Sequence, residues 1–225
     1  NGSLEDWFDI NFTIYNCLLE HAINLYIGGE DIANGMFIIP NTITNITDES
    51  FAGFKGLTEV VISENVVSIG EMAFCGCVNL SKVTFAENSK LETIGDGAFA
   101  GSGIVSIDIP SIVTNVGGRA FEGCHKLVSV SLPESVKNIG QNLFNGCEKL
   151  EHVKLPRSIE IIPTGTFSSC RSLKSIELPE TVTTIRESAF YQCSGLVSVV
   201  LPNGLTKIEN NAFYGCNNLY TVINK

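Results

Sequence analysis

Apolar residues recur along this chain with a period of about 23 residues. Four tandem units, 132–154, 155–177, 178–200 and 201–223, align without a gap, and each begins with Leu-Pro. Self-similarity at such a period is typical of solenoids, in which every unit packs on its neighbours. A phenylalanine column extends the repeat toward the N-terminus and indicates eight coils: Phe51, Phe74, Phe99, Phe121, Phe144, Phe167, Phe190 and Phe213.

Each unit contains a short alternating segment that predicts a β-strand. In residues 152–155 the apolar Val153 and Leu155 are two apart, so they face inward while His152 and Lys154 face outward. Pro156 ends the segment, because proline has no N–H to donate to a ladder and restricts the residue before it. Equivalent strands of successive coils are expected to stack about 4.8 Å apart in one sheet.

The rest of each unit predicts a second extended piece and a tight turn. A glycine follows the second piece in four coils, at Gly70, Gly95, Gly117 and Gly140, where we expect a bend with positive φ. The next two coils carry Pro163 and Arg186 there. The Ala-Phe-x-Gly-Cys stretch is too short for an isolated helix and favours a 3₁₀-like turn.

A cysteine column runs beside the phenylalanines and is best explained by packing. Two coils carry Phe54 and Ser102 in this slot, which therefore accepts small or apolar fillers rather than requiring a thiolate. A zinc site is not expected, because zinc needs four ligands that converge on one point. A disulfide between neighbouring coils is disfavoured, because parallel cysteine side chains resist the dihedral angle that it requires. Outside the column, Cys75 is expected to be the exposed thiol, and a Cys17–Cys75 bridge stays open. The column residues are Cys77, Cys124, Cys147, Cys170, Cys193 and Cys216.

The recurrent motif resembles one repeat family. AFCGCVNLSKVTF, LFNGCEKLEHVKLP and AFYQCSGLVSVVLP follow the pattern AFxGCxxLxxVxLP, which is similar to the BspA-type leucine-rich repeat family. The resemblance implies a β-rich, right-handed leucine-rich-repeat solenoid with parallel strands on its concave face, short 3₁₀ or turn segments and short strands elsewhere, and little α-helix. We expect an N-terminal cap with a degenerate first repeat over 1–39 and one continuous domain of tandem repeats over 40–225. The family implies a secreted or surface-anchored protein that binds host proteins.

Composition and motifs argue against several classes of function. The formal net charge is −10 and lysines and arginines do not cluster, so nucleic acid is not an expected partner. No apolar run approaches the ~18 residues of a membrane span, so membrane insertion is not expected. The sequence has none of the common zinc-protease, nucleophile-elbow or nucleotide-binding motifs. We therefore expect a protein that is not an enzyme and has no catalytic residue, cofactor or metal.

Outward strand positions are the candidate partner-binding face. Such positions display variable side chains over a rigid backbone, and we expect a protein or glycan ligand there. Glu151 is predicted to lie beside Lys174, and Lys154 beside Glu177, as opposite charges on adjacent strands. The face consists of Glu151, His152, Lys154, Lys174, Glu177, Val197, Val200, Tyr220 and Ile223.

The last coil suggests a second kind of contact. Val197, Val200, Tyr220 and Ile223 make its outward face apolar, and exposed apolar patches tend to mark contacts. Terminal repeats normally need a polar cap, which LYTVINK does not provide. We expect self-association or further repeats at this edge.

Three functions remain distinct at this stage. The leading interpretation is a recognition module, secreted or at the cell surface, that binds a host protein or glycan through the exposed strand face. One alternative is a structural spacer with no tight ligand. The other, less favoured, is a hydrolase or metalloenzyme whose site combines residues from different coils.

Overall fold

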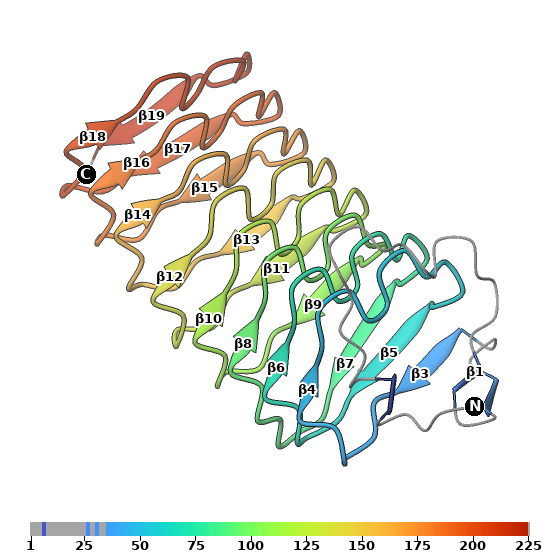
Figure 1. Ribbon diagram of the computed structural model, residues 1–225. Helices are drawn as coiled ribbons and strands as arrows, with labels where there is room; N and C mark the ends of the chain where they lie inside the picture. The colour runs from blue at the N-terminus through green and yellow to red at the C-terminus, as the bar shows by residue number, and fades with distance from the viewer. Residues whose placement is uncertain (1–5, 8–25, 28–29, 32–34, 225) are drawn as a thin grey trace.

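The computed structural model describes residues 6–7, 26–27, 30–31 and 35–224, and residues 35–224 form one parallel β-solenoid (Figure 1). Each coil contributes one strand to a first face and a shorter strand to a second face. No α-helix occurs within residues 35–224. The fold is therefore the parallel solenoid that the repeats predict.

The first face carries the longer strands, in register from coil to coil. Val130 pairs with Ile107 of the preceding coil and with Val153 of the next one. Its strands are β3 (Met36–Ile38), β5 (Glu59–Ile62), β7 (Lys82–Phe85), β9 (Ser106–Asp108), β11 (Ser129–Ser131), β13 (His152–Lys154), β15 (Ser175–Glu177), β17 (Ser198–Leu201) and β19 (Thr221–Asn224).

The second face consists of two-residue strands, which also pair in parallel. They are β4 (Asn45–Ile46), β6 (Ser68–Ile69), β8 (Thr93–Ile94), β10 (Asn115–Val116), β12 (Asn138–Ile139), β14 (Ile161–Ile162), β16 (Thr184–Ile185) and β18 (Lys207–Ile208). Near the N-terminus, β1 (Tyr26–Ile27) and β2 (Glu30–Asp31) pair antiparallel. Most of the expected cap, 1–39, lies outside the described residues, and its boundary stays a prediction.

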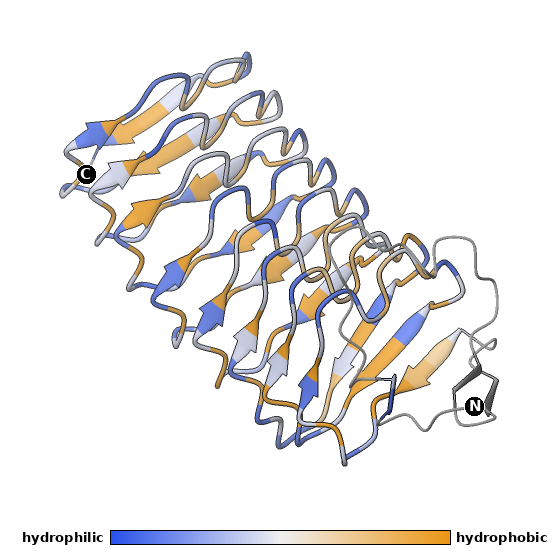
Figure 2. Cartoon of the chain, in the orientation of Figure 1, coloured by the Kyte–Doolittle hydropathy of each residue, from blue (hydrophilic) through white to orange (hydrophobic). Residues whose placement is uncertain are grey.

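The core lies between the two faces because strand residues alternate in and out. Ile107, Val130 and Ile176 point inward and are at most 5% exposed, whereas their neighbours in the strand reach solvent. Figure 2 shows this alternation as apolar and polar segments along the strands. Seven phenylalanines of the column are fully buried, and successive rings from Phe51 to Phe213 stack with centroids 5.0–5.8 Å apart.

The segment around each column phenylalanine is a run of β-turns rather than a 3₁₀ helix. It has the i to i−3 bonds that a 3₁₀ helix would have, for example from Cys77 N–H to the Phe74 carbonyl at 3.3 Å. However, the residues two before and two after the phenylalanine have positive φ, as at Met72 (52°) and Gly76 (69°). Left-handed residues at these places are typical of type II turns. The prediction of a tight turn is confirmed, but its 3₁₀ geometry is corrected.

The glycines after the second strand serve close packing, not a left-handed bend. Positive φ is not found at Gly70, Gly95, Gly117 or Gly140, so the expected bend geometry is wrong. A Cβ added to Gly95 would instead lie 2.7 Å from the carbonyl carbon of Gly70. In these four coils glycine is needed, because the preceding coil approaches too closely to leave room for a Cβ.

Both faces are interrupted between the coils 132–154 and 155–177, a boundary that we call the central seam. There β13 and β15 fall in different sheets, and so do β12 and β14. The first face is also interrupted between β7 and β9, but there Val105 N–H still reaches the Ser81 carbonyl at 3.4 Å and the second face is continuous. Within residues 35–224 the central seam is thus the one boundary where both ladders stop.

Candidate binding face

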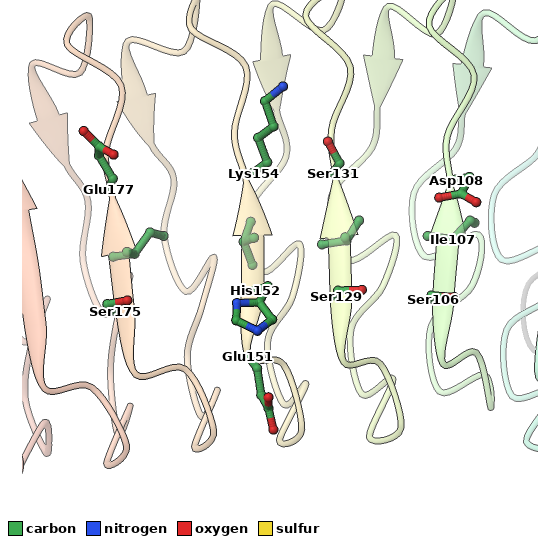
Figure 3. A pocket seen from close by; sticks show the side chains of 13 residues that line it. Ser106, Ile107, Asp108, Ser129, Ser131, Glu151, His152, Lys154, Ser175 and Glu177 are labelled. Atoms are coloured by element: carbon green, nitrogen blue, oxygen red, sulfur yellow. The ribbon is translucent and has the colours of Figure 1, made fainter.

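The outward side chains of the first face form two rows along the solenoid. In one row Ser129 lies between Ser106 and His152, and in the other Ser131 lies between Asp108 and Lys154. Figure 3 shows these side chains at the same levels of successive strands. A groove over β9 to β15 is lined by these residues together with Glu151, Ser175 and Glu177. Hydroxyl, carboxylate, imidazole and ammonium groups therefore converge on one shallow surface.

Four of the five predicted residues of the central part line this groove. Glu151, His152 and Lys154 come from β13 or the residue before it, and Glu177 belongs to β15. Lys174 precedes β15 and is exposed, but it does not line the groove. The structure thus brings four of the five residues to one surface, and their role in binding stays a prediction.

The predicted ion pairs assume that β13 and β15 are paired strands, and these strands are not paired. Lys154 Nζ lies 3.8 Å from Glu134 Oε1, and about half or more of each side chain is exposed. Exposed pairs of this kind contribute at most about 1 kcal/mol. The central seam therefore lacks the strand pairing on which the predicted ion pairs depend.

The C-terminal part of the predicted face is exposed and apolar. Val197, Tyr220 and Ile223 are 42%, 78% and 47% exposed, and Val200 is half-buried. The sequence pattern missed Val222 and Ile208, which are 56% and 48% exposed. Both residues occupy inward positions, which are buried in earlier coils, so the repeat predicts that they are buried. They are exposed because they belong to the last described coil, and no described coil packs over them.

The cysteine column is interior packing with an added hydrogen bond. Five of its six thiols are buried, and Cys216 is partly buried. Each Sγ donates to the carbonyl of the phenylalanine in the preceding coil, as from Cys147 to Phe121 at 3.1 Å. Because the acceptor lies 25 or 26 residues earlier in the chain, sequence spacing gave no sign of this bond.

Burial keeps these thiols protonated. It raises the pKa of the Cys124 thiol to about 12 and raises the pKa of Cys147 well above its ordinary value. The neighbouring Cys193 and Cys216 side chains interact with each other, which raises the pKa of Cys193 and lowers the pKa of Cys216. Thiolate chemistry is therefore disfavoured along the column up to its last member. The Cys17–Cys75 bridge involves Cys17, which lies outside the described residues.

The described residues contain no group of three or more His, Cys, Asp and Glu side chains arranged to hold a metal ion. None of the described helical segments has the length and apolar character of a membrane span. The absence of a cofactor and of catalysis remains a prediction.

Comparison with known families agrees with the motif. The model of the BspA type leucine rich repeat region matches residues 32–102 and 92–220, with six copies. This match confirms the resemblance that the repeats suggest. A comparison with curated protein sequences finds no match.

Solved bacterial structures share the architecture. A leucine-rich repeat protein from Bacteroides ovatus ATCC 8483 is 29% identical, over 85% of this chain and 63% of that chain, with a TM-score of 0.60. The leucine rich repeat protein of T. pallidum is 25% identical, over 83% of this chain and 78% of that chain, also with a TM-score of 0.60. The present chain thus spans less than two thirds of the Bacteroides protein.

Proposed function

Since this chain belongs to the BspA-type leucine-rich repeat family, we propose that it is a recognition module that binds a host protein or glycan through its first face. The proposal is carried by the contrast between the two sides of each strand. Inward positions repeat Val, Ile and Leu in every coil, whereas outward positions change from Ser and Asp to His, Lys and Glu around one groove. Side chains that do not contribute to the core are available for recognition.

The proposed setting is the cell surface or the extracellular medium, as the family implies. The cysteines of the column are free thiols, so the fold of residues 35–224 does not depend on disulfides between them. A structural spacer with no tight ligand is the competing function. The two differ in whether the outward side chains contribute to any affinity.

A four-residue alanine variant separates these functions. We expect replacement of Glu151, Lys154, Lys174 and Glu177 by alanine to weaken binding at least tenfold to any ligand found on panels of host matrix proteins and glycans, because it removes the charged groups of the groove. Biolayer interferometry measures the affinity, and circular dichroism checks the fold.

The control replaces two exposed charges of the second face, Lys137→Ala and Glu160→Ala, and should leave the affinity unchanged. A ligand that binds both variants as well as the unmodified chain would contradict the proposal. A chain that binds neither panel would favour the spacer.

A further inference from the structure

The central seam is a wedge that is closed on one side and open on the other. On the closed side, Phe144 N–H donates to the Thr166 carbonyl at 2.9 Å and Gly146 N–H to the Ser168 carbonyl at 2.8 Å. On the open side, β13 and β15 share no ladder. Figure 3 shows the strand of Ser175 and Glu177 standing further from that of His152 and Lys154 than the latter stands from its other neighbour.

The angle between the planes of neighbouring phenylalanine rings also increases near the central seam. Neighbouring rings from Phe51 to Phe121 are within 4° of parallel. The angle is 11° between Phe121 and Phe144, 17° between Phe144 and Phe167 and 15° between Phe167 and Phe190, and it returns to 4° between Phe190 and Phe213. The rings are thus most strongly tilted at the central seam and at the boundaries on either side of it.

Pro163 explains why the ladder of the second face stops here. In the coils before and after, Gly140 and Arg186 donate their N–H to Val116 and Ile162 of the preceding coil. Proline at the same position has no N–H to donate, so the second face cannot close on Ile139 in the same way.

The open side leaves backbone groups of the first face without their usual partners. In the neighbouring coil, the Lys174 carbonyl accepts from the N–H groups of Val197 and Ser198 at 2.7 and 3.3 Å. The equivalent groups at the central seam are the N–H groups of Lys174 and Ser175 and the carbonyl of Glu151, and these are not hydrogen-bonded to one another. Donors and acceptor thus face each other across the gap.

The floor of the gap is apolar. Val153 points inward but is only partly buried, whereas its counterparts Val130 and Ile176 are 4% and 5% exposed. A hollow next to it continues over Leu155 and Leu178. No Phe, Tyr or Trp lines either this hollow or the groove, so the stacking surface that a sugar ring would use is not present there.

We propose that the central seam binds an extended peptide segment of a partner protein. The backbone of this peptide forms the hydrogen bonds that β13 and β15 do not form with each other. Carbonyls of the peptide accept from the N–H groups of Lys174 and Ser175, and an N–H of the peptide donates to the Glu151 carbonyl, as in strand addition to a sheet edge. An apolar side chain of the segment covers Val153. This proposal rests on the proposed function, and it identifies the partner class as peptide and the contact as main-chain pairing.

Pro163→Gly tests the site because it restores the N–H and removes the ring. We expect the seam to close and the exchange of the Lys174 and Ser175 amides, measured by hydrogen–deuterium exchange, to slow at least tenfold. Arg186→Gly makes the same residue type at the same position of the next coil, where the ladder is intact, and should leave exchange unchanged. Pro163→Ala restores the N–H as well and serves if the glycine variant does not fold.

Binding is measured with a random heptapeptide phage library panned on the unmodified chain. The selected peptide, made synthetically, should bind the Arg186→Gly variant within twofold of the unmodified chain and the Pro163→Gly variant at least tenfold more weakly. Methylation of its backbone nitrogens should cost a further tenfold or more, because it removes main-chain hydrogen bonds.

Three results would overturn the inference: no peptide is selected, the peptide binds the Pro163→Gly variant as well as the unmodified chain, or methylation has no effect. A ligand that is lost with the four-alanine variant but not with Pro163→Gly would leave the proposed function standing and remove this inference alone. Absence of any protein, glycan or peptide ligand would remove both.

Discussion

At the scale of single residues, the cysteine slot combines packing with hydrogen bonding. The motif predicts burial, and burial is found at Cys77, Cys124, Cys147, Cys170 and Cys193. Ser102 fills the same slot, where it is 3% exposed and its Oγ lies 3.4 Å from Cys124 Sγ. Phe54 fills the slot without a side-chain donor and is fully buried, so the slot requires burial and the hydrogen bond is an addition that the cysteines make.

Alkaline pH should weaken the fold through these thiols. The ordinary pKa of a thiol is about 8.5, whereas burial raises the pKa of Cys124 to about 12. Between these values the unfolded chain loses the proton and the folded chain keeps it, so the free energy of unfolding falls by about 1.4 kcal/mol per pH unit per thiol. Below about pH 8.5 this contribution is fully retained.

Cys124→Ser removes one such thiol while keeping a donor of the kind found at Ser102. We expect the free energy of unfolding, from urea denaturation between pH 9 and 12, to decline less steeply than in the unmodified chain by about 1.4 kcal/mol per pH unit. Equal slopes in the two proteins would show that this thiol does not stay protonated in the folded state.

At the scale of elements, the period of the sequence predicts the strands well but not the reason for the glycines. Alternation of apolar and polar residues in a unit is a local property, so the strands could be read from it. The closeness of Gly95 to Gly70 depends on how two coils stack, which no single unit contains. For the same reason, the turn around each phenylalanine could be placed but its left-handed residues could not be assigned.

Gly95→Ala should destabilise the solenoid. The added Cβ would lie 2.7 Å from the Gly70 carbonyl carbon and 2.9 Å from the Glu71 nitrogen, so the coils must separate, at a cost of roughly 1–3 kcal/mol. Gly204→Ala is the matched control, because its Cβ would meet only the Glu180 carbonyl oxygen at 3.6 Å. Urea denaturation of both variants measures the difference, and equal stabilities would refute the packing explanation.

At the scale of the whole molecule, eight coils and the position of the candidate face could be predicted, whereas the central seam could not. Pro163 stood out as an exception to the glycine rule, but its effect depends on Gly140 and Ile139 in the coil before it. The predicted charge pairs assumed an unbroken ladder between β13 and β15, which the structure does not have. A regular repeat predicts regular stacking, so a departure from it becomes visible only in three dimensions.

The apolar C-terminal edge is expected to be covered by a second copy of the chain or by further repeats, and the association of two copies can be tested directly. β18 and β19 each pair on one side only, and the inward-type residues Ile208 and Val222 are about half exposed. A two-fold axis would bring the same edge of each copy together and let β19 pair antiparallel with its counterpart.

Ile208→Lys together with Val222→Lys places charges on that edge and should shift the protein toward the monomer. Light scattering over a concentration series measures the mass, and circular dichroism confirms the fold. Val105→Lys, at an exposed position in the middle of the first face, is the control and should not change the mass. A monomeric unmodified chain at all concentrations would contradict self-association.

The row of sulfur atoms has a consequence for how the molecule meets oxidants. Five thiols are sealed between neighbouring windings, and the sixth, Cys216, is reachable from the end. Because the pKa of Cys216 is also lowered, we expect peroxide to react with Cys216 first. The buried thiols should react only when the coils that cover them open, so oxidation of the row should proceed from the C-terminal coil inward.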